Sequence, residues 1–172
     1  AMLTACGGGG GGSKSFEAQV EDAVFAAYSQ AFNRNNLKTN DPALKKLAQK
    51  SLDCVKNGRF SYNDMEKCMD VTVSASDPDK YILSMAMPMP DPNGYASEYS
   101  FKVLAITPEM LGNLKANMGD TEDGLEEVVV DLEEKGGKLE GVGVAAKTVD
   151  GKTYVAVAFA ISGSESLFDD LL

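Results

Sequence analysis

The feature that most constrains the fold is a pair of apolar runs near the carboxyl end that flank a tight turn signal. The runs cover residues 141–146 and 153–159 and are rich in valine and alanine. Between them lies Val149-Asp150-Gly151-Lys152, and an Asp-Gly pair between strand-like runs is typical of a two-residue β-hairpin turn. The sequence therefore predicts an antiparallel hairpin in this part of the chain.

Helical periodicity dominates the amino-terminal part. Apolar residues recur at helical spacing from Phe16 to about Asn33, which predicts a first helix. Asp41-Pro42 supplies an N-cap and a proline at the first helical position, so a second helix is expected to begin there and to end at a left-handed stop at Asn57-Gly58. A shorter third helix is expected from Asn63 or Asp64 to about Met69.

The middle of the chain combines strand and loop signals. Residues 71–73 and 81–85 are predicted strands, separated by the turn signal Asp77-Pro78-Asp79. The segment 87–94 carries three prolines at alternate positions, and each proline removes a hydrogen-bond donor from a strand ladder. A loop is therefore expected there, and a central strand is not.

Three more elements are expected before the hairpin. Residues 99–106 are predicted to form a strand, and Thr107-Pro108-Glu109 is typical of the start of a helix, which is expected to reach about Met118. Residues 121–135 fit a helix, but the valine run at 128–130 also fits a short strand. The pattern leaves both readings open.

The amino terminus carries a short motif followed by glycines. Leu3-Thr4-Ala5-Cys6, which precedes Gly7 to Gly12, closely resembles the lipobox of bacterial prolipoproteins. The resemblance implies a signal peptide, a diacylglyceryl group on Cys6 and attachment to the extracytoplasmic face of the bacterial cell membrane. Two acyl chains suffice for stable anchoring, whereas one holds only marginally.

These signals divide the chain into three parts. Residues 1–14 are interpreted as a lipobox remnant and a glycine-rich tether. Residues 15–163 are expected to form a single globular domain, because a chain of 172 residues can bury one core of ordinary size. Residues 164–172 are expected to be an acidic tail.

Composition excludes several classes of function. The formal net charge is −10 and no stretch concentrates lysine and arginine, so nucleic acid is not an expected partner. The chain has no histidine, which removes the commonest general base and the usual metal ligand. Gly141 and Gly143 precede a strand and not a helix, so they indicate close packing and no dinucleotide site. No metal or other cofactor is expected.

Two parts of the domain resemble one known family. Residues 40–51 with 57–62 resemble the second helix and exit turn of the CAP superfamily (cysteine-rich secretory proteins, antigen 5 and pathogenesis-related proteins), and residues 140–145 with 154–160 resemble its closing hairpin. The resemblance implies an α+β fold, a three-layer α-β-α sandwich with a mainly antiparallel sheet. The family's usual histidine after the exit turn corresponds here to Tyr62, so no metal ligands are carried over.

Two groups of residues are candidate sites. Cys54 and Cys68 lie 14 residues apart, and either a disulfide or two buried thiols fit this spacing in an exported protein. Tyr62, Tyr95 and Tyr99, together with Glu98, are expected to line a cleft suited to gripping a ligand.

The sequence predicts a surface-anchored, extracytoplasmic lipoprotein whose non-enzymatic domain binds a peptide, a glycan or a protein. One alternative is a hydrolase of cell-wall glycan or peptide that uses paired carboxylates such as Glu66 and Glu98, a chemistry that needs no histidine. Another is a lipoprotein that captures a small solute in an enclosed pocket.

Overall fold

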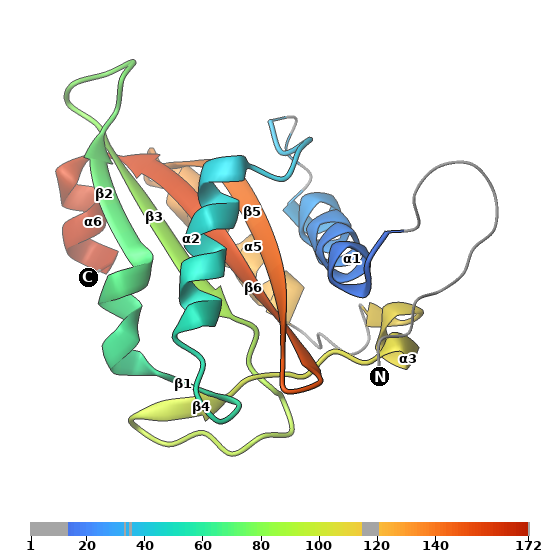
Figure 1. Cartoon of the computed structure of the whole chain (residues 1–172). Helices are drawn as coiled ribbons and strands as arrows, with labels where there is room; N and C mark the ends of the chain where they lie inside the picture. The colour runs from blue at the N-terminus through green and yellow to red at the C-terminus, as the bar shows by residue number, and fades with distance from the viewer. Residues whose placement is uncertain (1–13, 33, 35, 115–120, 172) are drawn as a thin grey trace.

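A computed structural model describes residues 14–32, 34, 36–114 and 121–171, which form helices around antiparallel sheets. The main sheet has the strand order β2-β3-β6-β5, and a two-stranded ribbon pairs β1 with β4 near the β5–β6 turn (Figure 1). The predicted α+β class is therefore confirmed. The strands are β1 (Arg59–Ser61), β2 (Met69–Val73), β3 (Tyr81–Pro88), β4 (Ser100–Lys102), β5 (Lys138–Val149) and β6 (Lys152–Gly163).

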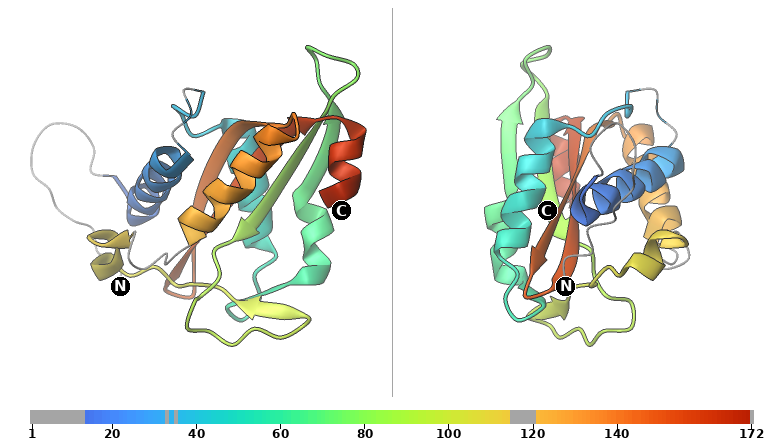
Figure 2. Two further views of the ribbon diagram at one scale, coloured as in Figure 1. Left: turned by 180° about the vertical axis from the view of Figure 1, so that it is seen from behind. Right: turned by 45° about the vertical axis from the view of Figure 1, so that its right-hand side comes forward.

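Helices lie on both faces of the main sheet, as the two views of Figure 2 show. Helix α2 (Pro42–Asp53) crosses one face, and α1 (Phe16–Phe32) and α5 (Thr121–Glu134) lie on the other. The two faces bury separate apolar clusters, one under α2 and one under α1 and α5. The resemblance to the CAP superfamily stays a prediction.

The predicted carboxyl-terminal hairpin is confirmed. Strands β5 and β6 pair from Lys138↔Ser162 to Val149↔Lys152. The turn between them places Asp150 at φ 51° and Gly151 at φ 77°. Two successive left-handed residues make the turn whose twist matches that of the flanking strands, and Asp-Gly adopts it readily.

Helix α2 begins as predicted but ends earlier. Asp41 Oδ1 accepts hydrogen bonds from the backbone N–H groups of the first turn, at 2.9 and 3.0 Å. The helix ends at Asp53, four residues before Asn57. Asn57 and Gly58 are left-handed, at φ 52° and 71°, but they form the centre of a second tight hairpin turn, in which Arg59 N donates to Lys56 O at 3.0 Å. The expected helix stop was wrong.

Strand β3 includes Met87 and Pro88, so the prediction of a loop over 87–94 was wrong at its beginning. Among the described strands, β2 pairs with β3 only as far as Met85, and beyond it β3 has a neighbour on one side. Met89 N donates to Val155 O of β6 at 2.9 Å. Because alternate residues of a strand direct their N–H groups to opposite sides, the nitrogen of Pro88 faces the side without a strand partner, where the missing donor is tolerated.

The carboxyl-terminal segment is folded onto the domain, which corrects the expected acidic tail at 164–172. Residues Glu165–Leu171 form helix α6. Leu167 and Phe168 are only 4% and 7% exposed. The Leu167 side chain lies against Gly137 and Gly163, where an added Cβ would come within 2.8 and 2.3 Å of its Cδ2 atom. The burial of these two adjacent apolar residues holds the short helix against the domain.

The remaining elements refine the predicted boundaries. The expected third helix is a 3₁₀ helix, η1 (Tyr62–Cys68), capped by Ser61 and not by Asn63 or Asp64. The predicted strand at 99–106 is shorter, as β4 covers only Ser100–Lys102. Helix α3 (Pro108–Leu111) begins as expected, and the predicted end near Met118 lies outside the described residues. Residues 121–134 form α5, so the helical reading is confirmed there.

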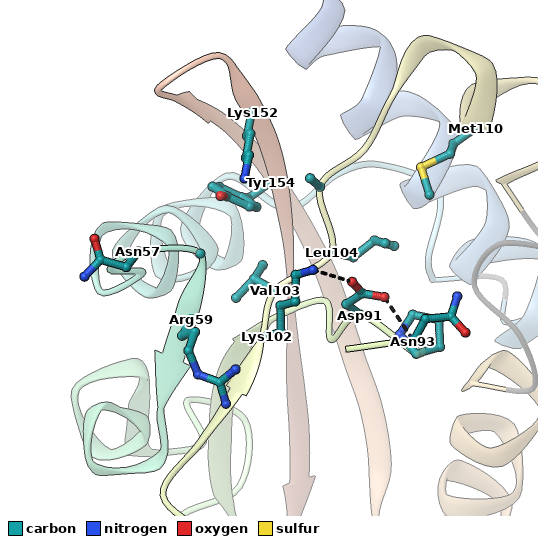
Figure 3. A pocket seen from close by; sticks show the side chains of 13 residues that line it. Asn57, Arg59, Asp91, Asn93, Lys102, Val103, Leu104, Met110, Lys152 and Tyr154 are labelled. Atoms are coloured by element: carbon teal, nitrogen blue, oxygen red, sulfur yellow. Dashed lines mark hydrogen bonds and ion pairs between the residues drawn. The ribbon is translucent and has the colours of Figure 1, made fainter. Parts of the chain in front are cut away.

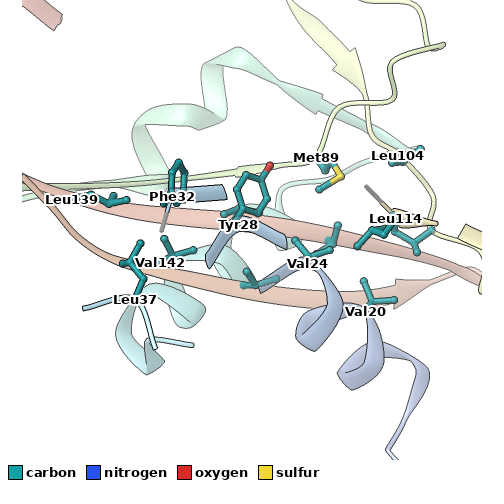
Figure 4. Close-up of a cluster of buried hydrophobic side chains, with 14 of the residues drawn as sticks. Val20, Val24, Tyr28, Phe32, Leu37, Met89, Leu104, Leu114, Leu139 and Val142 are labelled. Carbon is teal, nitrogen blue, oxygen red and sulfur yellow. The ribbon is translucent and has the colours of Figure 1, made fainter. Parts of the chain in front are cut away.

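The core under α1 follows directly from its sequence spacing. Val20, Val24, Tyr28 and Phe32 recur every four residues and form one buried stripe against the sheet (Figure 4). The rings of Tyr28 and Phe32 both meet the ring of Phe159 edge-on, with centroids 5.8 and 5.7 Å apart. Edge-to-face contacts of this kind add to the stabilisation from burial alone.

The face under α2 is built from small residues instead. Leu44, Ala48 and Leu52 of α2 are buried against a row of alanines in β5 and β6. At Gly143 the helix comes so close that an added Cβ would lie 2.4 Å from the backbone nitrogen of Lys45. The lack of a side chain at Gly143 therefore allows α2 to lie this close to the sheet.

The outer edge of β5 is covered by the amino-terminal segment. On this side β5 has no partner strand among the described residues. Its backbone groups from Val142 to Thr148 form hydrogen bonds instead with α1 and with the segment that leads into α2. The hydrogen bonds are Asp41 N to Val142 O (3.1 Å), Asn40 Nδ2 to Val144 O (2.9 Å), Val144 N to Asn40 Oδ1 (2.8 Å), Ala146 N to Glu21 Oε1 (3.0 Å) and Thr148 N to Glu17 Oε1 (2.8 Å). An edge strand covered in this way cannot pair with another chain.

Candidate functional site: a tyrosine surface and an adjoining pocket

The three predicted site tyrosines gather around the β1–β4 ribbon. Pairing of Ser61 with Ser100 places Tyr62 beside Tyr99, and Tyr62 N donates to Tyr99 O at 2.9 Å. An isolated bridge between Ala96 and Phe101 brings the loop that carries Tyr95 to the same ribbon. We call Tyr62, Tyr95, Tyr99 and Arg59 the tyrosine surface.

Neither of the two described pockets is lined by these tyrosines, and the expected cleft stays a prediction. Tyr62, Tyr95 and Tyr99 are 40%, 75% and 69% exposed. Phe60 and Phe101 of the ribbon are buried in the core, and the flanking tyrosines lie on the outside. The rings form an open surface.

Two contacts orient the tyrosine surface. The ring of Tyr62 lies against that of Phe101, with centroids 5.7 Å apart, and the guanidinium of Arg59 lies 5.9 Å from the centroid of the Tyr95 ring. Arg59 is fixed in turn by Ser100, which accepts bonds from Nε at 3.0 Å and from Nη2 at 3.1 Å. A guanidinium held in this way supports the aromatic face beside it by a cation–π contact.

Glu98 lies at the edge of the tyrosine surface. A hydrogen bond between its side chain and the hydroxyl of Tyr99 raises the pKa of that hydroxyl, and desolvation adds to the shift in the same direction. Glu66, the other carboxylate of the hydrolase hypothesis, is exposed on η1, and Glu98 is also exposed. Neither carboxylate lines the adjoining pocket.

A pocket of about 480 Å³ adjoins the tyrosine surface and shares Arg59 with it (Figure 3). Five parts of the sequence line this Tyr154 pocket, and no local motif predicted it. Its polar residues come from both hairpin turns, from the loop at 91–93 and from β4, and its apolar residues come mainly from the segment after β4. The lining residues are Asn57, Gly58, Arg59, Asp91, Pro92, Asn93, Lys102, Val103, Leu104, Ala105, Met110, Lys152 and Tyr154.

Cys54 and Cys68 are free thiols in this structure, and they are neighbours. The pKa of the Cys68 thiol is raised to about 11, mainly by burial and in addition by the charge of Cys54 and a hydrogen bond with it. Cys54 Sγ also donates to Lys50 O at 3.5 Å. Cys68 is buried and Cys54 is half-buried, and both readings of the pair, a disulfide or two buried thiols, stay predictions.

Two further features of the described residues concern metal ions and membranes. Residues 14–114 and 121–171, apart from 33 and 35, contain no group of three or more Cys, Asp or Glu side chains placed to hold a metal ion. Among the helices of these residues, none has the length and apolar character needed to cross a membrane. Cys6, the predicted lipid-bearing residue, lies outside the described residues.

Comparisons with protein-family models, with curated proteins and with solved structures found no match to this chain. The case for a function therefore depends on the tyrosine surface and the Tyr154 pocket themselves.

Proposed function

We propose that this chain is a surface-anchored, extracytoplasmic binding protein without enzymatic activity, and that its tyrosine surface holds a glycan or a peptide. The observation that carries the proposal is the convergence of three exposed tyrosines and an oriented arginine on one small ribbon. The pairing of β1 with β4 brings Tyr62 beside Tyr99, and the bridge between Ala96 and Phe101 adds the loop that carries Tyr95.

The physical basis is the amphipathic character of tyrosine. Each ring offers an apolar face and a polar hydroxyl, and it loses little conformational entropy on binding, which makes tyrosine and arginine common at binding surfaces. The three tyrosines are 40–75% exposed, so part of their apolar ring surface lies in water. A ligand that covers the rings removes this surface from water, which favours binding. The short ribbon presents them on a rigid support.

The rival function, hydrolysis by Glu66 and Glu98, gains no support from their positions. A carboxylic acid that protonates a leaving group needs a sheltered environment that keeps it neutral, and both side chains are exposed. A binding role makes no such demand on either residue.

The membrane attachment belongs to the same proposal. It is supported by the lipobox-like Leu3-Thr4-Ala5-Cys6 and by the glycine run that follows. Mass spectrometry of the protein from its native membrane is expected to find an acylated amino-terminal Cys6, and an unmodified cysteine in that sample would contradict the anchor.

Removing two rings of the tyrosine surface is expected to weaken binding to cell-wall material. A Tyr95→Ser/Tyr99→Ser variant should bind isolated peptidoglycan about thirtyfold more weakly than the wild type, because two aromatic contacts of about 1 kcal/mol each are lost. Co-sedimentation of the protein with insoluble peptidoglycan measures the affinity. Both residues are strongly exposed, so the unfolding transition should not change.

The matched control is Tyr81→Ser, which removes a tyrosine at the far end of the main sheet, in β3. It should bind peptidoglycan like the wild type. Equal binding by the double variant and the wild type, or no binding by either, would count against the proposal. Release of soluble fragments that depends on Glu66 and Glu98 would establish the hydrolase instead.

A further inference from the structure

The Tyr154 pocket contains a buried hydroxyl without a partner. Tyr154 is 6% exposed, and no described residue makes a hydrogen bond with its hydroxyl group. The hydroxyl lies beside Gly58, where a Cβ atom would come within 3.4 Å of it, so the lack of a side chain there leaves room around the oxygen. An unsatisfied buried hydroxyl costs about 1–3 kcal/mol, and a ligand that bonds to it recovers part of that cost.

The charge of the pocket is opposite to that of the chain. Arg59, Lys102 and Lys152 line it against one carboxylate, Asp91, so the lining carries a net charge of +2 on a chain of net charge −10. Lys102 is partly neutralised by Asp91, with Nζ and Oδ2 3.5 Å apart. Lys152 forms no ion pair within the described residues.

Lys152 and Tyr154 act from the same side of the pocket. They are separated by one residue in β6, so their side chains project to the same face of the strand, and Figure 3 shows them adjacent at the pocket wall. An ammonium group and a phenolic hydroxyl both donate hydrogen bonds, and the ammonium group adds positive charge. This pair suits a group that carries negative charge and accepts hydrogen bonds.

The size of the pocket indicates more than a bare ion. About 480 Å³ falls within the range of small-molecule sites. Val103, Leu104 and Met110 give it an apolar side, and the amide side chains of Asn57 and Asn93 add neutral hydrogen-bonding groups. The charged group of a ligand would therefore occupy only one part of the space, and an uncharged body would fill the rest.

We propose that the Tyr154 pocket binds an oxyanion, the phosphate or carboxylate group of a small organic ligand, through Lys152 and the hydroxyl of Tyr154. None of the three surface tyrosines lines the pocket, so this site does not depend on the proposed peptidoglycan binding. A ligand of this kind also fits the small-solute alternative raised by the sequence.

The test is a titration of the ¹⁵N-labelled protein, followed by NMR, with inorganic phosphate, D-glucuronate and D-glucose as probes. Phosphate or glucuronate should produce saturable shifts at the backbone amides of Gly58, Lys152 and Tyr154, and glucose should not. A stronger response to phosphate identifies a phosphate-bearing ligand, and a stronger response to glucuronate identifies a carboxylate-bearing one. Shifts that do not saturate, or that glucose reproduces, would overturn the proposal.

Three variants separate the pocket from the general charge of the protein. Lys152→Gln and Tyr154→Phe should each weaken binding of the responding anion about five- to tenfold, because the first removes the positive charge that faces the anion and the second removes a hydrogen-bond donor to it. Lys46→Gln removes the same charge from an exposed position of α2 and should leave the affinity unchanged. Equal weakening by all three variants would show non-specific attraction and would refute the site.

The stability of Tyr154→Phe gives an independent readout. Because the hydroxyl has no described partner, its removal should leave the unfolding midpoint unchanged or raise it. A clear loss of stability would show that the hydroxyl is already satisfied within the protein, and the proposal would lose its main support.

Discussion

Replacing Gly143 by alanine is expected to lower the free energy of unfolding by about 3 kcal/mol or more, near the upper end of what overpacking usually costs. The new Cβ would lie 2.4 Å from the backbone nitrogen of Lys45 and 2.5 Å from the carbonyl carbon of Leu44. These are backbone atoms in the first turn of α2, so no side-chain rotation can relieve the clash. The helix must shift away from β5, which weakens the packing of the whole α2 face.

The matched control lies two residues earlier on the same strand. A Cβ at Gly141 would come within 3.1 Å of Leu44 Cδ1, the movable end of a flexible side chain. Gly141→Ala is therefore expected to cost about 1 kcal/mol, with the difference between the two variants measured by chemical denaturation. Similar costs for both variants would contradict a helix seated on Gly143.

Local sequence signals predicted those elements whose geometry is decided within a few residues. Asp41-Pro42 starts α2, and Asp150-Gly151 makes the β5–β6 turn, because each pair satisfies the backbone requirement of its own position. Gly141 and Gly143 correctly indicated close packing. Their partner, helix α2, was not identified, because a glycine does not specify what approaches it.

The wrong predictions were those decided by tertiary contacts. Pro88 is accepted in a strand because β2 ends before reaching it. Helix α6 forms because Leu167 and Phe168 find buried positions at the end of the sheet. Composition alone made both segments look irregular, and the neighbours that changed this outcome lie far away in the sequence.

The candidate site divides in the same way. The grouping of Tyr62, Tyr95 and Tyr99 was anticipated, but their exposure was not, because the ribbon turns its phenylalanines inward and its flanking tyrosines outward. The Tyr154 pocket gave no sequence signal. Its lining residues lie at 57–59, 91–93, 102–105, 110, 152 and 154, and the bridges Pro90↔Val103 and Ile106↔Thr153 help to bring them together.

Replacing Asn40 by alanine is expected to lower the free energy of unfolding by about 2 kcal/mol, since two hydrogen bonds to the backbone of an edge strand are lost together. The Asn40 side chain behaves like one residue of a neighbouring strand, because it donates to Val144 O at 2.9 Å and accepts from Val144 N at 2.8 Å. No alanine side chain can replace either bond.

Asn36→Ala is the matched control, because Asn36 donates one bond of good length to the same strand, at 2.9 Å to Leu139 O. It should cost about 1 kcal/mol, half the effect of Asn40→Ala. Hydrogen exchange should also accelerate at the amide of Val144 in Asn40→Ala and not in Asn36→Ala. Because a bare strand edge is a template for pairing with another chain, Asn40→Ala should aggregate more readily on heating, and unchanged exchange at Val144 would refute this role of Asn40.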